Sequence, residues 1–225
     1  MKKITVLLAE DHTIVREGFR KMLELEKDLE IVGEAQDGRQ AVALVKKLKP
    51  AVVLMDIAMP LLNGLEATRQ ILKDFPATKI LMLSAHSDDA YVSTAVESGA
   101  VGFLLKQTSA HEVCRAIREV AAGKTFFAAS ITKHFNRLNP LLPANKGKLN
   151  TKTVRLTSRE MEVLQLIAEG KANKETATEL GIGIKTVEKH REHLMTKLDI
   201  HDTAGLTRYA VSAGIIESSV QVTIV

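Results

Sequence analysis

The first 120 residues alternate between short apolar runs and longer stretches in which apolar side chains recur with helical spacing. Apolar runs bounded by turn residues lie at 4–9, 30–35, 51–55, 79–84 and 101–105. Runs of this kind are typical of strands in a parallel sheet that is covered on both faces. The helical spacing occurs in segments 13–26, 38–48, 64–74, 88–98 and 109–122. Strands that alternate with helices in this way predict an α/β fold, a doubly wound five-stranded parallel sheet with right-handed crossovers.

The composition is that of an ordinary globular protein with room for two modest domains. The chain has 225 residues, of which 45% are hydrophobic and 26% charged. No run approaches the roughly 20 apolar residues that a membrane span needs, and the N-terminus lacks the features of a signal peptide. We therefore expect a cytoplasmic protein with no membrane contact. The single cysteine, Cys114, excludes an internal disulfide framework and lies on an apolar helical face, which indicates a buried thiol.

The net charge of +4 is concentrated in the middle of the chain, because residues 120–149 contain five lysines and arginines and no acid. The charge alone is therefore weak support for nucleic-acid binding. Residues 121–152 also break the alternation, since they contain Pro140, Pro143 and Gly147. We interpret this segment as a linker with room for a short helix around residues 128–137.

Residues 153–216 are helical throughout and form a second, small all-α domain. Thr157 and Glu160 predict a capping box at the start of its first helix. A short helix, a glycine-containing turn and a longer helix then follow, which is a helix-turn-helix outline. The expected organisation is a domain at 4–120, the linker at 121–152, the helical domain at 153–216 and a C-terminal tail at 217–225.

Polar residues stand at the end of four of the expected strands. Glu10 and Asp11 follow the first, Asp56 follows the third, Ser84 ends the fourth and Lys106 follows the fifth. In a parallel sheet these ends meet at one edge, where ligands bind. Three neighbouring carboxylates repel one another unless a cation lies among them, and Mg²⁺ takes such oxygen ligands. With a lysine and a hydroxyl beside them, the set fits a phosphoryl group on Asp56.

Each of these residues also has an ordinary structural interpretation. Glu10 and Asp11 can cap the following helix, Asp56 can be a solvated strand end, Ser84 can belong to a turn and Lys106 can be a surface lysine. Taken one by one, these interpretations are favoured for all but Asp56. Their coincidence at the ends of several strands favours a shared site.

The motifs LLAEDH, VLMDIAMP, MLSAH and GFLLKQ resemble those of the flavodoxin-like receiver domain of bacterial response regulators. The resemblance implies that Asp56 is the phosphoacceptor. It implies that Asp11, Asp56 and the backbone of Ala58 bind Mg²⁺, with Glu10 acting through water. It also implies a phosphoryl switch formed by Ser84, Phe103 and Lys106. Two departures are Phe103, where many receivers have tyrosine, and Gln107, where many have proline.

The segment LTSREMEVLQLIAEGKANKETATELGIGIKTVEKHREHLMTKLDI is similar to the LuxR/NarL-type helix-turn-helix. Residues 184–198 are then the recognition helix, with Val187, His190, Leu194 and Leu198 on its inner face. The expected DNA-binding residues are Lys185, Thr186, Glu188, Lys189, Arg191, Glu192 and Lys197. Because the two glutamates repel phosphates, each domain is expected to bind weakly, and a homodimer on two half-sites compensates.

The leading hypothesis is a two-component response regulator, not an enzyme, whose partners are a sensor histidine kinase, double-stranded DNA and, when active, a second copy. One rival is an aspartyl-phosphate phosphatase of the haloacid-dehalogenase kind, but Ala58 stands where that chemistry needs a second acid. Another is a DNA-binding protein that works without phosphorylation, which the complete set of acids, serine and lysine disfavours. The alternative for residues 153–216 is a helical protein-interaction module.

Overall fold

The computed structural model describes residues 3–85, 89–127 and 156–216. The chain divides into two compact units, Met1–Thr151 and Lys152–Val225. The short helix expected at 128–137, most of the expected linker and the expected tail at 217–225 lie outside the described residues. Within the described parts of the chain, no helix is both long enough and apolar enough to cross a membrane.

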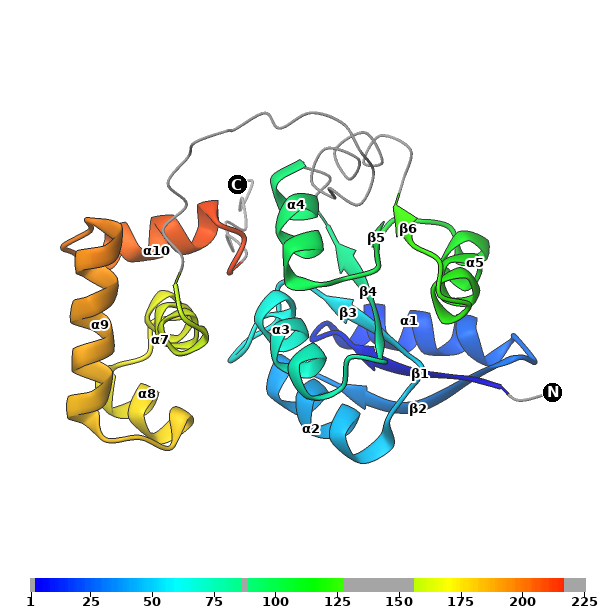
Figure 1. Ribbon diagram of the computed structural model, residues 1–225, viewed down its shortest axis with the longest axis horizontal. Helices are drawn as coiled ribbons and strands as arrows, with labels where there is room; N and C mark the ends of the chain where they lie inside the picture. Colours follow the sequence, from blue (N-terminus) through cyan, green and yellow to red (C-terminus); the bar gives the residue numbers. More distant parts are fainter. Residues whose placement is uncertain (1–2, 86–88, 128–155, 217–225) are drawn as a thin grey trace, which may run out of the picture. The chain divides into compact units, whose positions relative to one another are not determined.

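The first unit is built on a parallel sheet with the strand order β2-β1-β3-β4-β5-β6 (Figure 1). The strands are β1 (Ile4–Ala9), β2 (Leu29–Ala35), β3 (Val52–Asp56), β4 (Lys79–Ser84), β5 (Gly102–Leu105) and β6 (Phe126–Phe127). The first five confirm the expected strands. The sixth adds a strand within the segment expected to be a linker, since Phe126 and Phe127 pair with Gly102 and Phe103. A two-residue strand is too short to show a period in the sequence.

Helices cover both faces of this sheet (Figure 1). They are α1 (Thr13–Glu24), α2 (Gly38–Leu48), α3 (Gly64–Asp74), α4 (Asp89–Ser98) and α5 (Ala110–Ala121). One buried cluster joins the sheet to α1 and α5 through residues such as Phe19 and Ile117. The other joins it to α2, α3 and α4 through residues such as Val45, Ile71 and Val92. Because helices bury both faces of the sheet, the strands have continuous apolar sequences instead of alternating ones.

The strand order reverses between β1 and β3, which are direct neighbours although β2 separates them in the sequence. In open α/β sheets, ligands bind at the carboxyl ends of the strands beside such a reversal. Glu10 and Asp11 follow β1, and Asp56 is the last residue of β3. The fold therefore places these acids at the position where a binding site is expected.

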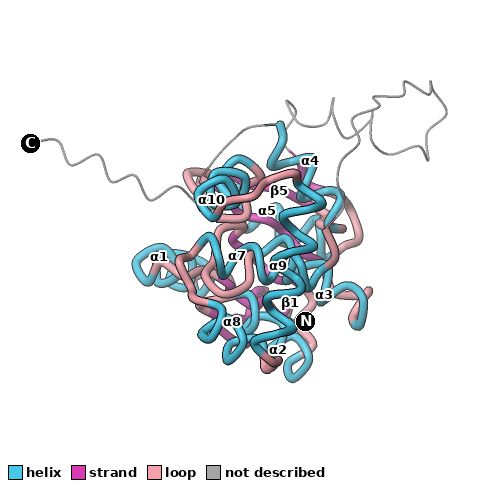
Figure 2. The backbone as a smooth tube through the Cα atoms, turned by 90° about the vertical axis from the view of Figure 1, so that its left-hand side faces the viewer, coloured by secondary structure: helices cyan, strands magenta, loops and turns pink. Residues whose placement is uncertain are grey.

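The second unit contains α7 (Ser158–Ala168), α8 (Asn173–Leu180), α9 (Ile184–Leu198) and α10 (Thr203–Ser212) in its described residues. The capping box predicted for Thr157 and Glu160 is present. Helix α9 packs against α7 and α8, and α10 packs against α7 (Figure 2). Their shared core contains fully buried Leu164, Val187, Leu194 and Leu206. The short α8, the turn and the longer α9 are the helix-turn-helix outline that the sequence predicts.

Candidate functional site

The carboxyl ends of β1, β3 and β5 bring two buried acids to one lysine. Lys106 Nζ lies 3.0 Å from Glu10 Oε2 and 3.0 Å from Asp56 Oδ2. The side chains of Glu10 and Asp56 are only 2% and 1% exposed. Asp56 and Lys106 lie 46 and 96 residues from Glu10 in the chain, so the sheet topology brings the three side chains together.

The charges of this cluster are not balanced by the protein alone. Burial, and next the charge of Glu10, raise the pKa of Asp56 to about 7, although Lys106 opposes the shift. Burial lowers the pKa of Lys106, but the charges of Asp56 and Glu10 outweigh it, so that pKa is raised. One ammonium faces Glu10, Asp56 and the nearby Asp11, which leaves a net negative site that favours a further cation.

The donor set fits a hard divalent ion. Glu10, Asp11, His12 and Asp56 each offer a ligand atom, and these atoms lie within 4.8 Å of one another. Asp56 Oδ1 is buried and has no hydrogen-bond partner among the described residues. An ionised oxygen of this kind is costly unless something binds it. Carboxylate oxygens are the ligands that Mg²⁺ prefers, so the residues present suit that ion.

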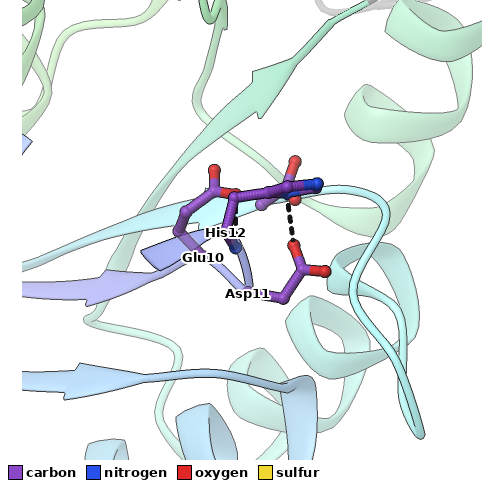
Figure 3. Close-up of side chains that lie close together, drawn as sticks. Glu10, Asp11 and His12 are labelled. Atoms are coloured by element: carbon purple, nitrogen blue, oxygen red, sulfur yellow. Dashed lines mark hydrogen bonds and ion pairs between the residues drawn. The ribbon is translucent and has the colours of Figure 1, made fainter. Parts of the chain in front are cut away.

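His12 is a member of the cluster that the sequence analysis did not assign. Its Nδ1 lies 3.0 Å from Glu10 Oε1 and 2.9 Å from Asp11 Oδ1. Figure 3 shows the three side chains close together. Partial burial lowers the pKa of His12, but the charge of Asp11 and the hydrogen bond to Glu10 outweigh it, and the net shift is upward. The His12 backbone N–H also donates to Glu10 Oε1 at 3.1 Å. The imidazole thus contacts both acids while remaining 56% exposed itself.

The chain leaves Asp56 through a tight turn into α3. Gly64 N–H donates to the carbonyl of Ile57 at 2.8 Å, and Asn63 Oδ1 accepts from Glu66 N–H at 2.9 Å. A Cβ added at Gly64 would lie 1.9 Å from the carbonyl oxygen of Asp56. Glycine is therefore required here for the start of α3 to approach the end of β3. Ala58 lies within this turn and is half-buried.

The residues expected to form a switch lie on the neighbouring strands β4 and β5. Ser84 is the last residue of β4 and is buried, and its carbonyl accepts from Lys106 N–H at 2.8 Å. Phe103 is buried in the cluster that the sheet forms with α2, α3 and α4. The backbone thus links Ser84 directly to the residue that carries the ammonium group.

In the second unit, α9 has the two faces that its sequence pattern predicts. Val187 and Leu194 are buried, and His190 and Leu198 are half-buried, which confirms the predicted inner face. The exposed side chains include Lys185, Thr186, Glu188, Lys189 and Glu192. Ile184, which the sequence analysis did not assign, is 45% exposed at the start of the helix. The exposed face therefore combines apolar, acidic and basic groups.

Two residues expected to contact DNA also have partners within the helical unit. Lys197 Nζ lies 2.7 Å from Oε2 of Glu160, the acid of the α7 capping box. Arg191 donates to Asn173 Oδ1 at 3.3 Å and to the hydroxyl of Thr203, so it ties α9 to α8 and α10. Helical spacing alone gives no sign of these contacts, because the partners come from other helices.

Comparison with known proteins assigns a family to each of the two units. Residues 6–118 match the response regulator receiver domain, and residues 154–210 match the luxR family of bacterial regulatory proteins. The chain is similar to the transcriptional regulatory protein LiaR of Bacillus subtilis, with 40% identity over 208 residues, which are 92% of this chain and 96% of that protein. The chain therefore belongs to the NarL/LuxR family of response regulators, with a receiver domain and a LuxR-type DNA-binding domain.

Solved structures of RcsB support the same assignment. RcsB from Salmonella enterica serovar Typhimurium, bound to the promoter rprA in the presence of phosphomimetic BeF₃⁻, matches with a TM-score of 0.59 and 26% identity. The match covers 92% of this chain and 98% of that one. A structure of two RcsB dimers bound to two parallel DNAs matches with a TM-score of 0.56 and 28% identity, covering 94% and 99% of the two chains.

Proposed function

We propose that a sensor histidine kinase phosphorylates Asp56 and that the phosphorylated protein binds specific DNA sites as a homodimer, in the cytoplasm, to regulate transcription. The observation that carries the proposal is the buried Asp56, which lies 3.0 Å from Lys106 and has an oxygen without a hydrogen bond. A carboxylate held in this way is a ready nucleophile for phosphorus. Transfer forms a bond from Asp56 oxygen to phosphorus and breaks the bond from phosphorus to the kinase histidine.

Asp11, Asp56 and the backbone carbonyl of Ala58 would hold Mg²⁺, with Glu10 acting through water. The ion would supply positive charge to the phosphoryl oxygens during transfer. Lys106, already paired with Asp56, would pair with a phosphoryl oxygen, and the Ser84 hydroxyl would donate to another. The burial of Phe103 supports its part in this switch. The movement of Ser84 and Phe103 would bias the receiver between two conformations.

The exposed face of α9 would enter the major groove. Lys185, Thr186 and Lys189 would meet phosphates or bases, while Glu188 and Glu192 would accept from exocyclic amino groups at base edges. Exposed Ile184 has the chemistry to contact a thymine methyl. Arg191 and Lys197 would support this face through their contacts with α7, α8 and α10 instead of touching DNA. LiaR is named a transcriptional regulatory protein, and the RcsB structure contains promoter DNA, which supports a transcription regulator as opposed to a metabolic enzyme.

The deciding experiment treats the full chain with Mg²⁺ and acetyl phosphate and follows its intact mass. Wild type is expected to gain one acid-stable, base-labile phosphoryl group and to bind DNA more tightly. Asp56→Asn is expected to gain none. Asp74→Asn removes an exposed carboxylate of the same domain, at the end of α3, and is expected to react like wild type. Equal labelling of the Asp56 variant would disprove the assignment.

A further inference from the structure

Helix α1 carries a buried arginine directly behind the acid pair. Arg16 is only 6% exposed, although arginine is among the residues that proteins rarely bury without partners. Its position in the first turns of α1 places it beside the turn that joins β1 to the helix. Neither the phosphoacceptor chemistry nor the proposed ion contacts involve this side chain.

The guanidinium group of Arg16 joins two segments of the chain. Its Nη1 donates to the carbonyl of Glu10 at 2.8 Å and to that of Asp11 at 3.5 Å. Its Nε donates to Glu34 Oε2 at 3.1 Å, and Glu34 belongs to β2. Arg16 thus clamps the backbone of both acids against the neighbouring strand.

The N-cap residue of α1 does not cap the helix with its own side chain. His12 is the N-cap residue of α1, but its side chain makes no capping hydrogen bond. A backbone bond from Glu10 N–H to the carbonyl of Ala35, at 3.1 Å, fixes the beginning of the turn. The carbonyls of Glu10 and Asp11, which set the direction in which the two carboxylates leave the backbone, are held by Arg16.

We propose that Arg16 is a positioning residue for the divalent-cation site, one that holds Glu10 and Asp11 facing Asp56. It acts through the two backbone carbonyls and contacts neither the ion nor the phosphoryl group. The inference rests on the proposed function, because it assigns Asp11 and Asp56 to the ion. Partners that orient metal ligands commonly change metal affinity by a factor of about 10 or more when they are removed.

A purely structural role is the alternative, in which Arg16 only joins α1 to β2. The chain contains a control for it in Arg118, whose side chain is 38% exposed. Arg118 donates to both carboxylate oxygens of Asp28, at 2.7 and 2.8 Å, and also pairs with Glu26. It ties α5 to the turn between α1 and β2, at the opposite end of β2 from Glu34. Loss of Arg118 therefore removes a clamp of similar kind without touching the acid pair.

The test measures Mg²⁺ affinity by calorimetric titration, together with thermal stability, for full-length wild type, Arg16→Gln, Arg16→Lys, Glu34→Gln and Arg118→Gln. Arg16→Gln is expected to weaken Mg²⁺ binding about tenfold. Arg16→Lys is expected to restore only part of it, since an ammonium is a point charge without the planar fork. Arg118→Gln should lose stability and keep wild-type affinity.

Glu34→Gln covers the case in which Arg16→Gln does not fold. It leaves the bonds from Nη1 to the carbonyls in place and removes the negative charge of the anchor, which Glu34 also presents to Arg20 at 3.7 Å. A roughly threefold loss of Mg²⁺ affinity is therefore expected, below the loss for full removal of an orienting partner. Wild-type affinity in both Arg16→Lys and Glu34→Gln would overturn the proposal. Failure of the proposed function would give a different result: the wild-type protein would bind Mg²⁺ but would take up no phosphoryl group from acetyl phosphate.

Discussion

The acid cluster and the exposed face of α9 are both rich in charge, but they are held in place in different ways. Asp56 and Glu10 are almost completely buried, and their surroundings include a lysine, a histidine and a tight turn. The charged residues Lys185, Glu188 and Lys189 of α9 are exposed. The first site depends on backbone geometry from several strands, whereas the second depends on one helix and the packing of its inner face.

This difference predicts how each site responds to substitution. A change that shifts the backbone near the cluster moves several ligands at once. Each misplaced charge is then costly, because the buried surroundings have a low dielectric constant. A change on the exposed face of α9 removes one group and leaves the helix in place, because the helix is held by Val187 and Leu194. Four predictions test this contrast, in order of decreasing effect.

The largest effect is expected for Gly64→Ala. The added Cβ would lie 1.9 Å from the carbonyl oxygen of Asp56, so either α3 or the end of β3 must move. Overpacking of this severity is expected to destabilise the receiver unit by about 3 kcal/mol and to reduce acetyl phosphate labelling. Chemical denaturation followed by circular dichroism measures the first effect.

Gly18→Ala is the matched control, since a Cβ at Gly18 of α1 meets nothing within 4 Å. Alanine is favoured over glycine inside a helix, so this variant should be stabilised by roughly 0.5–1 kcal/mol and labelled normally. Equal stability of the two glycine variants would show that the turn after Asp56 is not tightly fixed, and would weaken the contrast between the two regions.

The fold of the first unit was predictable because its strands are short apolar runs and its helices show regular spacing. Strands β1 and β4 coincide with the expected runs, and α2 and α3 with the expected helices. The exception is β6, whose two phenylalanines pair with β5 without any pattern that a local reading could detect. Backbone pairing at a sheet edge depends on where the chain returns after α5, and that is a tertiary property.

The residues of the acid cluster were predictable only where a general rule relates a residue's place in the sequence to its place in the fold. Strand ends share one edge of a parallel sheet, so the meeting of Glu10, Asp56 and Lys106 followed from the topology alone. No rule of that kind pointed to Arg16, whose partners are backbone carbonyls and a residue of β2. The contact between Lys197 and Glu160 could not be predicted for the same reason, since Glu160 lies 37 residues away on another helix.

A second prediction concerns ion binding. At a free Mg²⁺ concentration 100 times the dissociation constant, the receiver unit should gain about 2.7 kcal/mol of stability. Asp11→Ala should remove most of this gain, Glu10→Ala should remove less because Glu10 is proposed to act through water, and Asp74→Asn should keep it. Denaturation with and without Mg²⁺ measures the difference. An undiminished gain in Asp11→Ala would contradict the proposed ligand set.

A third prediction concerns the recognition face. Lys189→Ala should weaken binding to a selected DNA site by about 1–3 kcal/mol if Lys189 reads a base, with relaxed preference at one position per half-site. If it meets only a phosphate, binding should fall evenly across sequences, and the salt dependence should shrink by about one unit per half-site. Folding should be unchanged. Lys73→Ala, at an exposed lysine of α3, is the control for lost charge. Wild-type affinity and salt dependence in Lys189→Ala would show that this face does not bind DNA.

The smallest effect is expected for Lys197→Ala, which separates a lysine of α9 that supports the domain from one that binds DNA. Burial raises the pKa of Glu160, but hydrogen bonds from Lys197 and Thr157 outweigh it and the pKa is lowered. Lys197 is itself 38% exposed, so solvent screens the pair and its loss should cost no more than about 1 kcal/mol. Affinity for the selected DNA should stay at the wild-type value at physiological salt, where charges that do not contact the DNA are largely screened. Glu160→Ala should cost more stability, because it also removes the capping box at Thr157. A loss of DNA affinity in Lys197→Ala as large as that in Lys189→Ala would place Lys197 in the DNA interface and remove the distinction between the two lysines.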